Sequence, residues 1–149
     1  MAIIMHTVMD MTTRIAADSA FGCAGQRCLA ASVAITIGEA RDQFMPRIAE
    51  AASARKVGNG LDAGIEMGPV ITEESRARIG ALIESGLRDG ATAVVDGRGL
   101  KVNGGERGHF VGPTVLDGVK PGTELARTEI FGPVLSVMYM STVDDAIAY

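Results

Sequence analysis

The chain has 149 residues, the usual size of one domain, and its 47% hydrophobic and 21% charged residues make an ordinary globular balance. Its net charge of −4 comes from 18 acidic and 14 basic residues, which are spread along the sequence. Because no basic stripe is available for phosphate groups, we expect no nucleic-acid partner.

The apolar stretches of the chain are short. The longest, residues 29–37, is far too short to cross a bilayer, so we expect no membrane association. The first six residues lack the basic start and the long apolar region of a secretory signal. We therefore expect a reducing, cytoplasmic compartment.

Two cysteines, Cys23 and Cys28, are too few for a disulfide framework. With only His6 and His109 as imidazoles they form no four-ligand zinc pattern, so we expect no metal. The two cysteines could form a redox pair, but their Cys-x4-Cys spacing differs from the Cys-x-x-Cys spacing of redox motifs. A redox pair is therefore the minor alternative.

In chain order, the first half of the sequence predicts a helix, a strand and a second helix. Residues 9–21 have helical spacing, with Asp10 as a possible cap and apolar side chains at Met11, Ile15 and Phe21. Residues 31–37 are rich in β-branched side chains and predict a buried strand. Residues 39–56 predict a helix that begins near Pro46, because proline donates no backbone hydrogen bond.

The second half predicts a helix followed by three strands and the start of another helix. Thr72 can cap a helix whose apolar stripe is Ile79, Leu82, Ile83 and Leu87 and which ends at Gly90. Strands are predicted over residues 91–95, 110–116 and 134–140, the second of them interrupted by Gly112-Pro113, and Thr142 can cap a final helix. The order of elements predicts an α/β fold with helices layered on a mainly parallel sheet.

Cys28 is the candidate nucleophile. It follows a glycine-rich turn, and the neighbouring cation Arg27 would raise its thiolate fraction. Gly25 would allow the backbone to approach a bound carbonyl closely. The alternative reading is a buried, inert cysteine, and these residues alone favour it, because free cysteine is among the most buried residue types.

The segment Gly25-Gln-Arg-Cys28 resembles the Gly-Gln-x-Cys signature of the aldehyde dehydrogenase superfamily. About a hundred residues further on, Glu129-Ile-Phe-Gly-Pro-Val134 resembles that family's Glu-x-Phe-Gly-Pro motif. Residues 68–71 and 110–114 are similar to connecting segments of the family, in the same order. The resemblance covers nearly the whole chain and implies part of the catalytic domain of the aldehyde dehydrogenase fold.

Residues 17–28, 96–98 and 108–113 are most similar to the coenzyme A-acylating methylmalonate/malonate semialdehyde dehydrogenase subfamily. This resemblance implies that Cys28 attacks an aldehyde, that hydride passes to NAD, and that coenzyme A takes the acyl group from the resulting thioester. A hydrolytic enzyme that releases a free acid, and a truncated relative without activity, are the alternatives.

The resemblance assigns roles to three further residues. Arg27 would bind the carboxylate of a semialdehyde substrate, since a guanidinium pairs with carboxylates in a fork, although a structural arginine beside Cys28 is the competing reading. Glu129 resembles the glutamate that binds the nicotinamide ribose, and Phe131 the aromatic residue near the nicotinamide. A buried loop phenylalanine is the alternative for Phe131.

The resemblance also implies that residues 1–149 are only part of an enzyme. The NAD-binding domain and the C-terminal oligomerisation segment of the family have no counterpart in residues 1–149. In addition, the amino-acid sequence of residues 5–8 differs from the sequence usual in the family. We therefore expect a fragment that is inactive alone, whereas complete family members are expected to be homo-oligomers acting on a small aldehyde.

Overall fold

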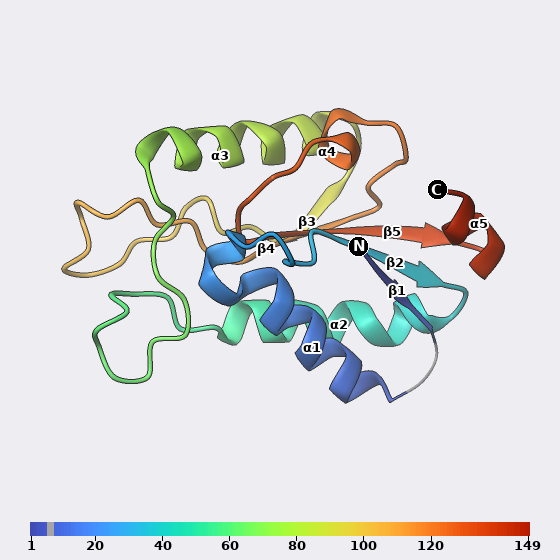
Figure 1. The fold of residues 1–149 in the computed structure, drawn as a ribbon, viewed down its shortest axis with the longest axis horizontal. Coiled ribbons are helices and arrows are strands. Elements are labelled where there is room, and N and C mark those ends of the chain that lie inside the picture. The colour runs from blue at the N-terminus through green and yellow to red at the C-terminus, as the bar shows by residue number, and fades with distance from the viewer. Residues whose placement is uncertain (6–7) are drawn as a thin grey trace.

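The computed structural model describes residues 1–5 and 8–149, so His6 and Thr7, within the departure at residues 5–8, lie outside the described residues. A five-stranded sheet lies between two layers of helices (Figure 1). Helices α1 (Met9–Phe21) and α2 (Ala40–Ala54) cover one face, and α3 (Glu73–Arg88) and α4 (Glu124–Arg127) lie on the other. This arrangement confirms the predicted α/β fold.

The sheet has the strand order β1-β2-β5-β4-β3, so every neighbouring pair except the last is parallel and only β3 runs antiparallel to β4. The central pair is in register from Val33 opposite Ser136 to Ile37 opposite Met140. The strands are β1 (Ala2–Ile4), β2 (Val33–Ile37), β3 (Thr92–Val95), β4 (Thr114–Asp117) and β5 (Val134–Met140).

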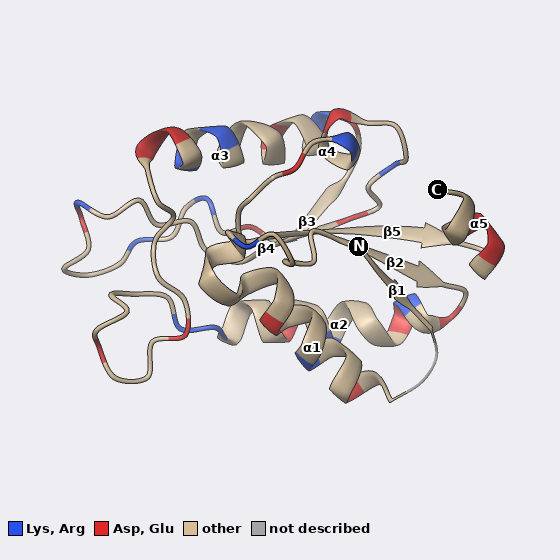
Figure 2. Cartoon of the chain, viewed as in Figure 1, with Lys and Arg blue, Asp and Glu red and all other residues tan. Residues whose placement is uncertain are grey.

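The sheet is apolar because helices cover both of its faces. In β5, the five residues from Val134 to Met138 are all buried. Asp117 is the one charged residue in the five strands, while charges of both signs mix along the helices and loops (Figure 2). Among the described residues no helix combines the length and the apolar character that a membrane span requires.

The predicted start of α2 near Pro46 was wrong. The helix begins at Ala40, and Pro46 lies inside it. Pro46 cannot donate to the carbonyl one turn before it, but Ala40, Phe44 and Met45 are all buried. The burial of this first helical face outweighs the cost of one missing hydrogen bond.

The face of α1 also differs from the prediction. Met11 and Ile15 are 49% and 59% exposed, whereas Phe21, the third predicted apolar position, is buried together with the small residues Ala16, Ala17 and Ala20. These alanines allow the close contact between α1 and α2. Asp10 does not cap the helix. It lies in the first turn, where the positive end of the helix dipole stabilises its negative charge.

Both predicted threonine caps are confirmed. The Oγ1 atom of Thr72 accepts a 3.1 Å hydrogen bond from the amide of Ser75 at the start of α3. Thr142 accepts an equivalent 3.1 Å bond from Asp145 and begins α5 (Val143–Ala148).

The predicted interruption of the 110–116 strand at Gly112-Pro113 is confirmed: Pro113 donates no backbone hydrogen bond, and β4 begins only at Thr114, so residues 110–111 are not part of a strand. The strand β1, the 3₁₀ turn at Gly22–Gly25 and helix α4 were not predicted. Each is four residues or fewer, which is too short for a periodic pattern to be recognised.

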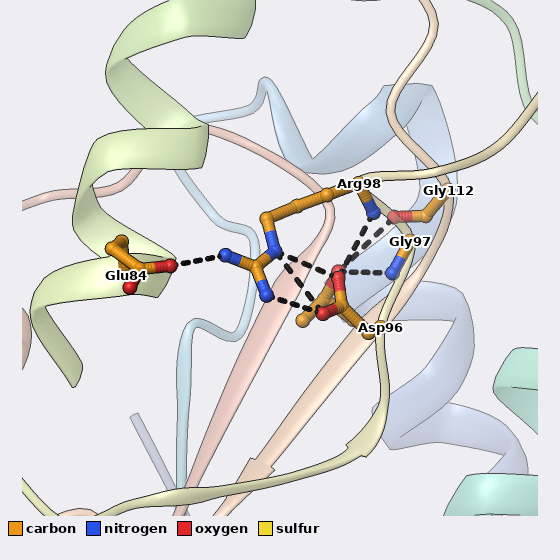
Figure 3. Close-up of polar contacts among 6 residues, drawn as sticks. Glu84, Asp96, Gly97, Arg98 and Gly112 are labelled. Carbon is orange, nitrogen blue, oxygen red and sulfur yellow. Dashed lines mark hydrogen bonds and ion pairs between the residues drawn. The ribbon is translucent and has the colours of Figure 1, made fainter. Parts of the chain in front are cut away.

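An ion network fixes the turn between β3 and the following loop (Figure 3). The Arg98 guanidinium forms bonds of 2.9 and 2.5 Å with the two carboxylate oxygens of Asp96, and a 2.6 Å bond with Glu84 of α3. The hydrogen bonds from Arg98 lower the pKa of Asp96. Next to this pair, the Gly97 amide donates to Thr114 Oγ1 at 3.0 Å, so the loop is tied to both α3 and β4.

We predict that Asp96→Asn lowers the free energy of unfolding at neutral pH by about 0.5–1 kcal/mol, since the pair is part-exposed. Because the pKa of Asp96 is lowered in the folded chain, its contribution is complete above its unfolded value of about 4 and is lost as the pH falls through the lower folded value. Urea titrations across this pH range measure the difference between variant and parent.

The control for this prediction is Asp62→Asn, which removes an exposed carboxylate without an ion pair among the described residues. An equal loss of stability in both variants at neutral pH, or a difference that grows as the pH falls, would contradict the assigned role of Asp96.

Candidate active site

The segments singled out in the sequence meet at one edge of the sheet. The loop that carries Cys28 leads into β2, and Glu129–Pro133 leads into β5, its parallel neighbour. Because the amino ends of adjacent parallel strands lie at the same edge, the two loops are brought side by side. Gly112 and Pro113 precede β4 at this edge as well, and the amide of Thr114 donates to the carbonyl of Pro133 at 2.8 Å.

The loop before Cys28 is a left-handed turn. Cys23, Ala24 and Gly25 have φ angles of 53°, 53° and 67°. Such a conformation costs a residue with a Cβ atom about 1–2 kcal/mol. The turn is closed by a 3.1 Å hydrogen bond from the Gln26 amide to the Cys23 carbonyl.

Gly25 joins this turn to the second motif. A Cβ atom at Gly25 would lie 2.0 Å from the carbonyl oxygen of Gly132 and 2.9 Å from the nitrogen of Pro133. Only glycine allows this contact between two backbones, and only glycine adopts the positive φ of Gly25 without strain. The glycine of the first motif therefore packs directly against the glycine of the second.

Gln26 ties the same loop to a third segment. Its side-chain Oε1 accepts a 3.1 Å hydrogen bond from the amide of Ile71, just before α3. The neighbouring amide of Val70 donates to the carbonyl of His109 at 3.0 Å. The loop that carries Cys28 is thus held from two sides, by residues 68–71 and by residues 132–133.

Cys28 is exposed, so the alternative of a buried cysteine is wrong. It lies in a second turn, which is closed by a 3.0 Å hydrogen bond from the Ala30 amide to the Arg27 carbonyl. Among the described residues, the Cys28 amide has no hydrogen-bond acceptor. An exposed thiol beside an unpaired N–H can attack a carbonyl carbon and stabilise the oxyanion that forms.

Arg27 is anchored to the end of α1. Its Nη2 donates to the carbonyl oxygens of Asp18 and Ser19, at 2.9 and 3.1 Å. Gly22 leaves room for the guanidinium, since a Cβ there would lie 2.8 Å from Nη2. In the described part of the chain, Nη1 and Nε of Arg27 form no hydrogen bond, so each of these two donors is without a competing acceptor, while both two-donor edges of the guanidinium include the occupied Nη2.

Glu129 and Phe131 lie on the segment that Gly25 contacts. The Glu129 side chain is exposed and has no ion pair among the described residues, and Phe131 is 36% exposed, so it is not a fully buried loop residue. Phe131 has a φ of 49°, a strained value for a residue with a Cβ atom.

Helix α3 holds this strained segment in place. Arg78 donates to the carbonyl oxygens of Glu129 and Ile130, at 3.2 and 2.6 Å. Gly132 packs on the next helix residue, where a Cβ atom would lie 2.5 Å from Ile79 Cδ1. These roles of Arg78 and Gly132 were not predicted, because a helical arginine and a motif glycine give no sequence signal of their long-range partners.

Metal-ligating side chains are not clustered in the described part of the chain: no group of three or more His, Cys, Asp or Glu residues is placed to hold an ion. The arrangement offers instead an exposed thiol, a part-free guanidinium and an unpaired carboxylate around a rigid backbone junction.

The aldehyde dehydrogenase family model matches residues 1–149, the entire chain. This chain belongs to the aldehyde dehydrogenase family. A curated Anopheles gambiae relative, a probable mitochondrial methylmalonate-semialdehyde/malonate-semialdehyde dehydrogenase of the acylating type, is 48% identical over 131 residues, which are 88% of this chain and 25% of the relative. The chain therefore spans about a quarter of the length of this relative.

Solved aldehyde dehydrogenases have the same fold. A putative methylmalonate-semialdehyde dehydrogenase from Sinorhizobium meliloti, solved with NAD, superposes with a TM-score of 0.96 and 38% identity over 99% of this chain and 30% of its own. A methylmalonate-semialdehyde dehydrogenase from Oceanimonas doudoroffii gives 0.95 and 41%, again over 99% and 30%. The predicted family and the predicted similarity to this type of enzyme are confirmed.

We predict that Gly25→Ala lowers the free energy of unfolding by at least about 2 kcal/mol, since the added Cβ meets the Gly132 carbonyl and the positive φ becomes strained. Chemical denaturation of the variant and the parent measures the loss.

Gly60→Ala is the matched control, because an added Cβ there has no atom within 4 Å and the backbone does not have a positive φ. The contact between the two motifs would be contradicted if Gly25→Ala were no more destabilising than Gly60→Ala.

Proposed function

We propose that this chain is part of the catalytic domain of an NAD-dependent dehydrogenase that oxidises methylmalonate or malonate semialdehyde to an acyl-coenzyme A. The observation that carries the proposal is the contact of Gly25 with Gly132, which unites the loop of the nucleophile with the segment of Glu129 and Phe131. In the Anopheles gambiae relative, the region that matches this chain is 25% of the polypeptide. The activity therefore belongs to a complete enzyme, with an NAD-binding domain and an oligomerisation segment supplied outside residues 1–149.

Cys28 acts as the nucleophile in this proposal. Its thiolate attacks the aldehyde carbon, and the oxygen that becomes negatively charged accepts a hydrogen bond from the unpaired Cys28 amide. The carbon then loses a hydride, which leaves an acyl group on the Cys28 sulfur as a thioester. The thiolate of coenzyme A, when bound, would attack the carbonyl carbon of this thioester, and the bond between that carbon and the Cys28 sulfur would break, so that Cys28 leaves as a thiolate.

NAD, when bound, supplies the acceptor for the hydride. The residues of this chain fit its nicotinamide end: Glu129 has an exposed carboxylate that can accept hydrogen bonds from ribose hydroxyls, and Phe131 offers an apolar ring beside it. The bonds from Arg78 and the packing of Gly132 on Ile79 fix the backbone of this segment before the cofactor arrives. The NAD complex of the similar Sinorhizobium meliloti protein supports this cofactor.

Arg27 selects the substrate in this proposal. A semialdehyde of the malonate type carries a carboxylate close to its aldehyde, and a guanidinium next to the nucleophile can pair with it while Cys28 attacks the other end. The anchoring of Nη2 to α1 fixes the orientation of the guanidinium and leaves Nη1 and Nε as separate donors, either of which can give the substrate carboxylate a single charge-assisted hydrogen bond. The structural role and the substrate role of Arg27 are thus compatible.

The acylating outcome is supported by the names of the curated relatives, which include the word acylating. A hydrolytic enzyme would release a free acid from the same thioester, and a non-catalytic relative would form no thioester. Thioester product in the presence of coenzyme A is the outcome that the proposal requires.

We predict that Arg27→Ala in the complete enzyme raises the KM for malonate semialdehyde about 10- to 100-fold, because a charge-assisted pair with the substrate carboxylate is lost. The comparison substrate is propanal, which has no carboxylate. Loss of the helix anchor would affect both substrates alike, so the ratio of kcat/KM for the two aldehydes isolates substrate binding. An unchanged ratio would remove Arg27 from the substrate site.

A further inference from the structure

Two guanidinium groups meet the end of α1, and the proposed reaction uses only that of Arg27. The second belongs to Arg55, directly after α2. Its Nη2 donates to the Oδ1 atom of Asp18 at 2.7 Å, and its guanidinium carbon lies 6.0 Å from the centre of the Phe21 ring. The Arg55 side chain is only 12% exposed, so these contacts hold it firmly against the last turn of α1.

Both cations bind Asp18, but at different groups of that residue. Arg27 Nη2 donates to the main-chain carbonyl of Asp18 at 2.9 Å, whereas Arg55 binds its carboxylate. A carboxylate binds a guanidinium more strongly than a neutral carbonyl does, and it can accept from two donors at once. The Asp18 carboxylate is therefore a competing acceptor on the very residue that Arg27 contacts.

This carboxylate needs a cation. Asp18 lies in the last turn of α1, at the negative end of the helix dipole, where an unpaired negative charge is unfavourable. In the described part of the chain, Arg55 is its ion-pair partner, and Arg27 forms no ion pair with it. If Arg55 lost its charge, Arg27 would be the cation bound to the same residue, and its guanidinium could turn toward the carboxylate.

We propose that Arg55 is a positioning residue for substrate selection, because it keeps the Asp18 carboxylate away from Arg27. Nη1 and Nε of Arg27 then stay available for the carboxylate of the substrate. This inference rests on the proposed role of Arg27 in semialdehyde binding. Without Arg55, a carboxylate tethered beside the site competes with the substrate at an effective concentration on the order of millimolar.

The two halves of the ion pair have opposite effects in this proposal, which separates it from a purely structural role. Arg55→Met keeps an apolar side chain over Phe21 but removes the charge, so the Asp18 carboxylate is freed to bind Arg27. Asp18→Asn removes the competing carboxylate and keeps the main-chain carbonyl that holds Nη2. If the pair only stabilised the end of α1, both substitutions would break it and act alike.

The test compares kcat/KM of the complete enzyme for malonate semialdehyde and for propanal, which has no carboxylate. We expect Arg55→Met to lower the ratio of the two values about three- to tenfold, through a raised KM for malonate semialdehyde, since the substrate must displace a charged competitor. Asp18→Asn should keep the parent's ratio, and the double variant should regain it. Arg55→Lys, which keeps a cation beside Asp18, should stay near the parent.

A second measurement does not depend on turnover. Phenylglyoxal reacts with unprotonated guanidinium groups, and a carboxylate partner stabilises the protonated form, so the rate of modification of the exposed Arg27 reports its partner. Trypsin does not cleave after a modified arginine, so residues 15–41 stay in one peptide instead of giving 15–27 and 28–41. We expect Arg55→Met to slow the modification at least about threefold, and the double variant to react at the parent's rate.

In an active enzyme, the positioning role is overturned if Arg55→Met leaves either the substrate ratio or the modification rate of Arg27 unchanged. It is also overturned if Asp18→Asn lowers them as much as Arg55→Met does, or if the double variant does not regain them. A complete enzyme that does not oxidise malonate semialdehyde would refute the proposed function, and the modification rates would still decide whether Arg55 keeps Asp18 from Arg27.

Discussion

The contact of the Gly25 turn with the Gly132 carbonyl is the constraint on which the rest of the site depends. Two segments about a hundred residues apart meet without side chains between them, and any Cβ atom at Gly25 would separate them. The turn on one side is left-handed, and Phe131 on the other side has a positive φ. Both strained conformations persist because Gln26, Arg78 and Ile79 hold the loops from outside the junction.

This junction lies at the amino ends of the parallel strands. Ligands of open α/β sheets usually bind at the carboxyl ends, where helix N-termini gather. Here the loops that enter β2, β4 and β5 carry the motifs instead, and they are linked by backbone hydrogen bonds such as that from Thr114 to Pro133. A rigid backbone junction positions Cys28, the proposed nucleophile, without relying on flexible side chains, and attack on a carbonyl requires such fixed positioning.

Most of the architecture could be predicted from sequence. The periodicity of α3, the caps Thr72 and Thr142 and the β-branched run of β2 are local signals, and the structure confirms each of them. The start of α2 could not be predicted, because the proline rule is local while the burial of Ala40 and Phe44 depends on the sheet. Nor did the exposed positions Met11 and Ile15 follow from helical spacing.

The site was only partly predictable. The amino-acid sequences of the two motifs, and their order along the chain, predicted Cys28, Glu129 and Phe131 as site residues. The contact between the motifs and the two bonds from Arg78 join residues far apart in the sequence, so no local pattern predicts them. The anchoring of Arg27 on α1 depends on the conformation of a long, flexible side chain, which the sequence does not specify.

The central claim is that this junction presents Cys28, and no other residue, to an aldehyde. The most direct measurement mixes the complete enzyme with NAD and malonate semialdehyde in the absence of coenzyme A, stops the reaction with acid and maps the peptides by mass spectrometry. We expect an acyl group on residues 28–41, removed when coenzyme A is added before the acid. NADH formation with the acyl group on Cys23, or on no cysteine, would contradict the account.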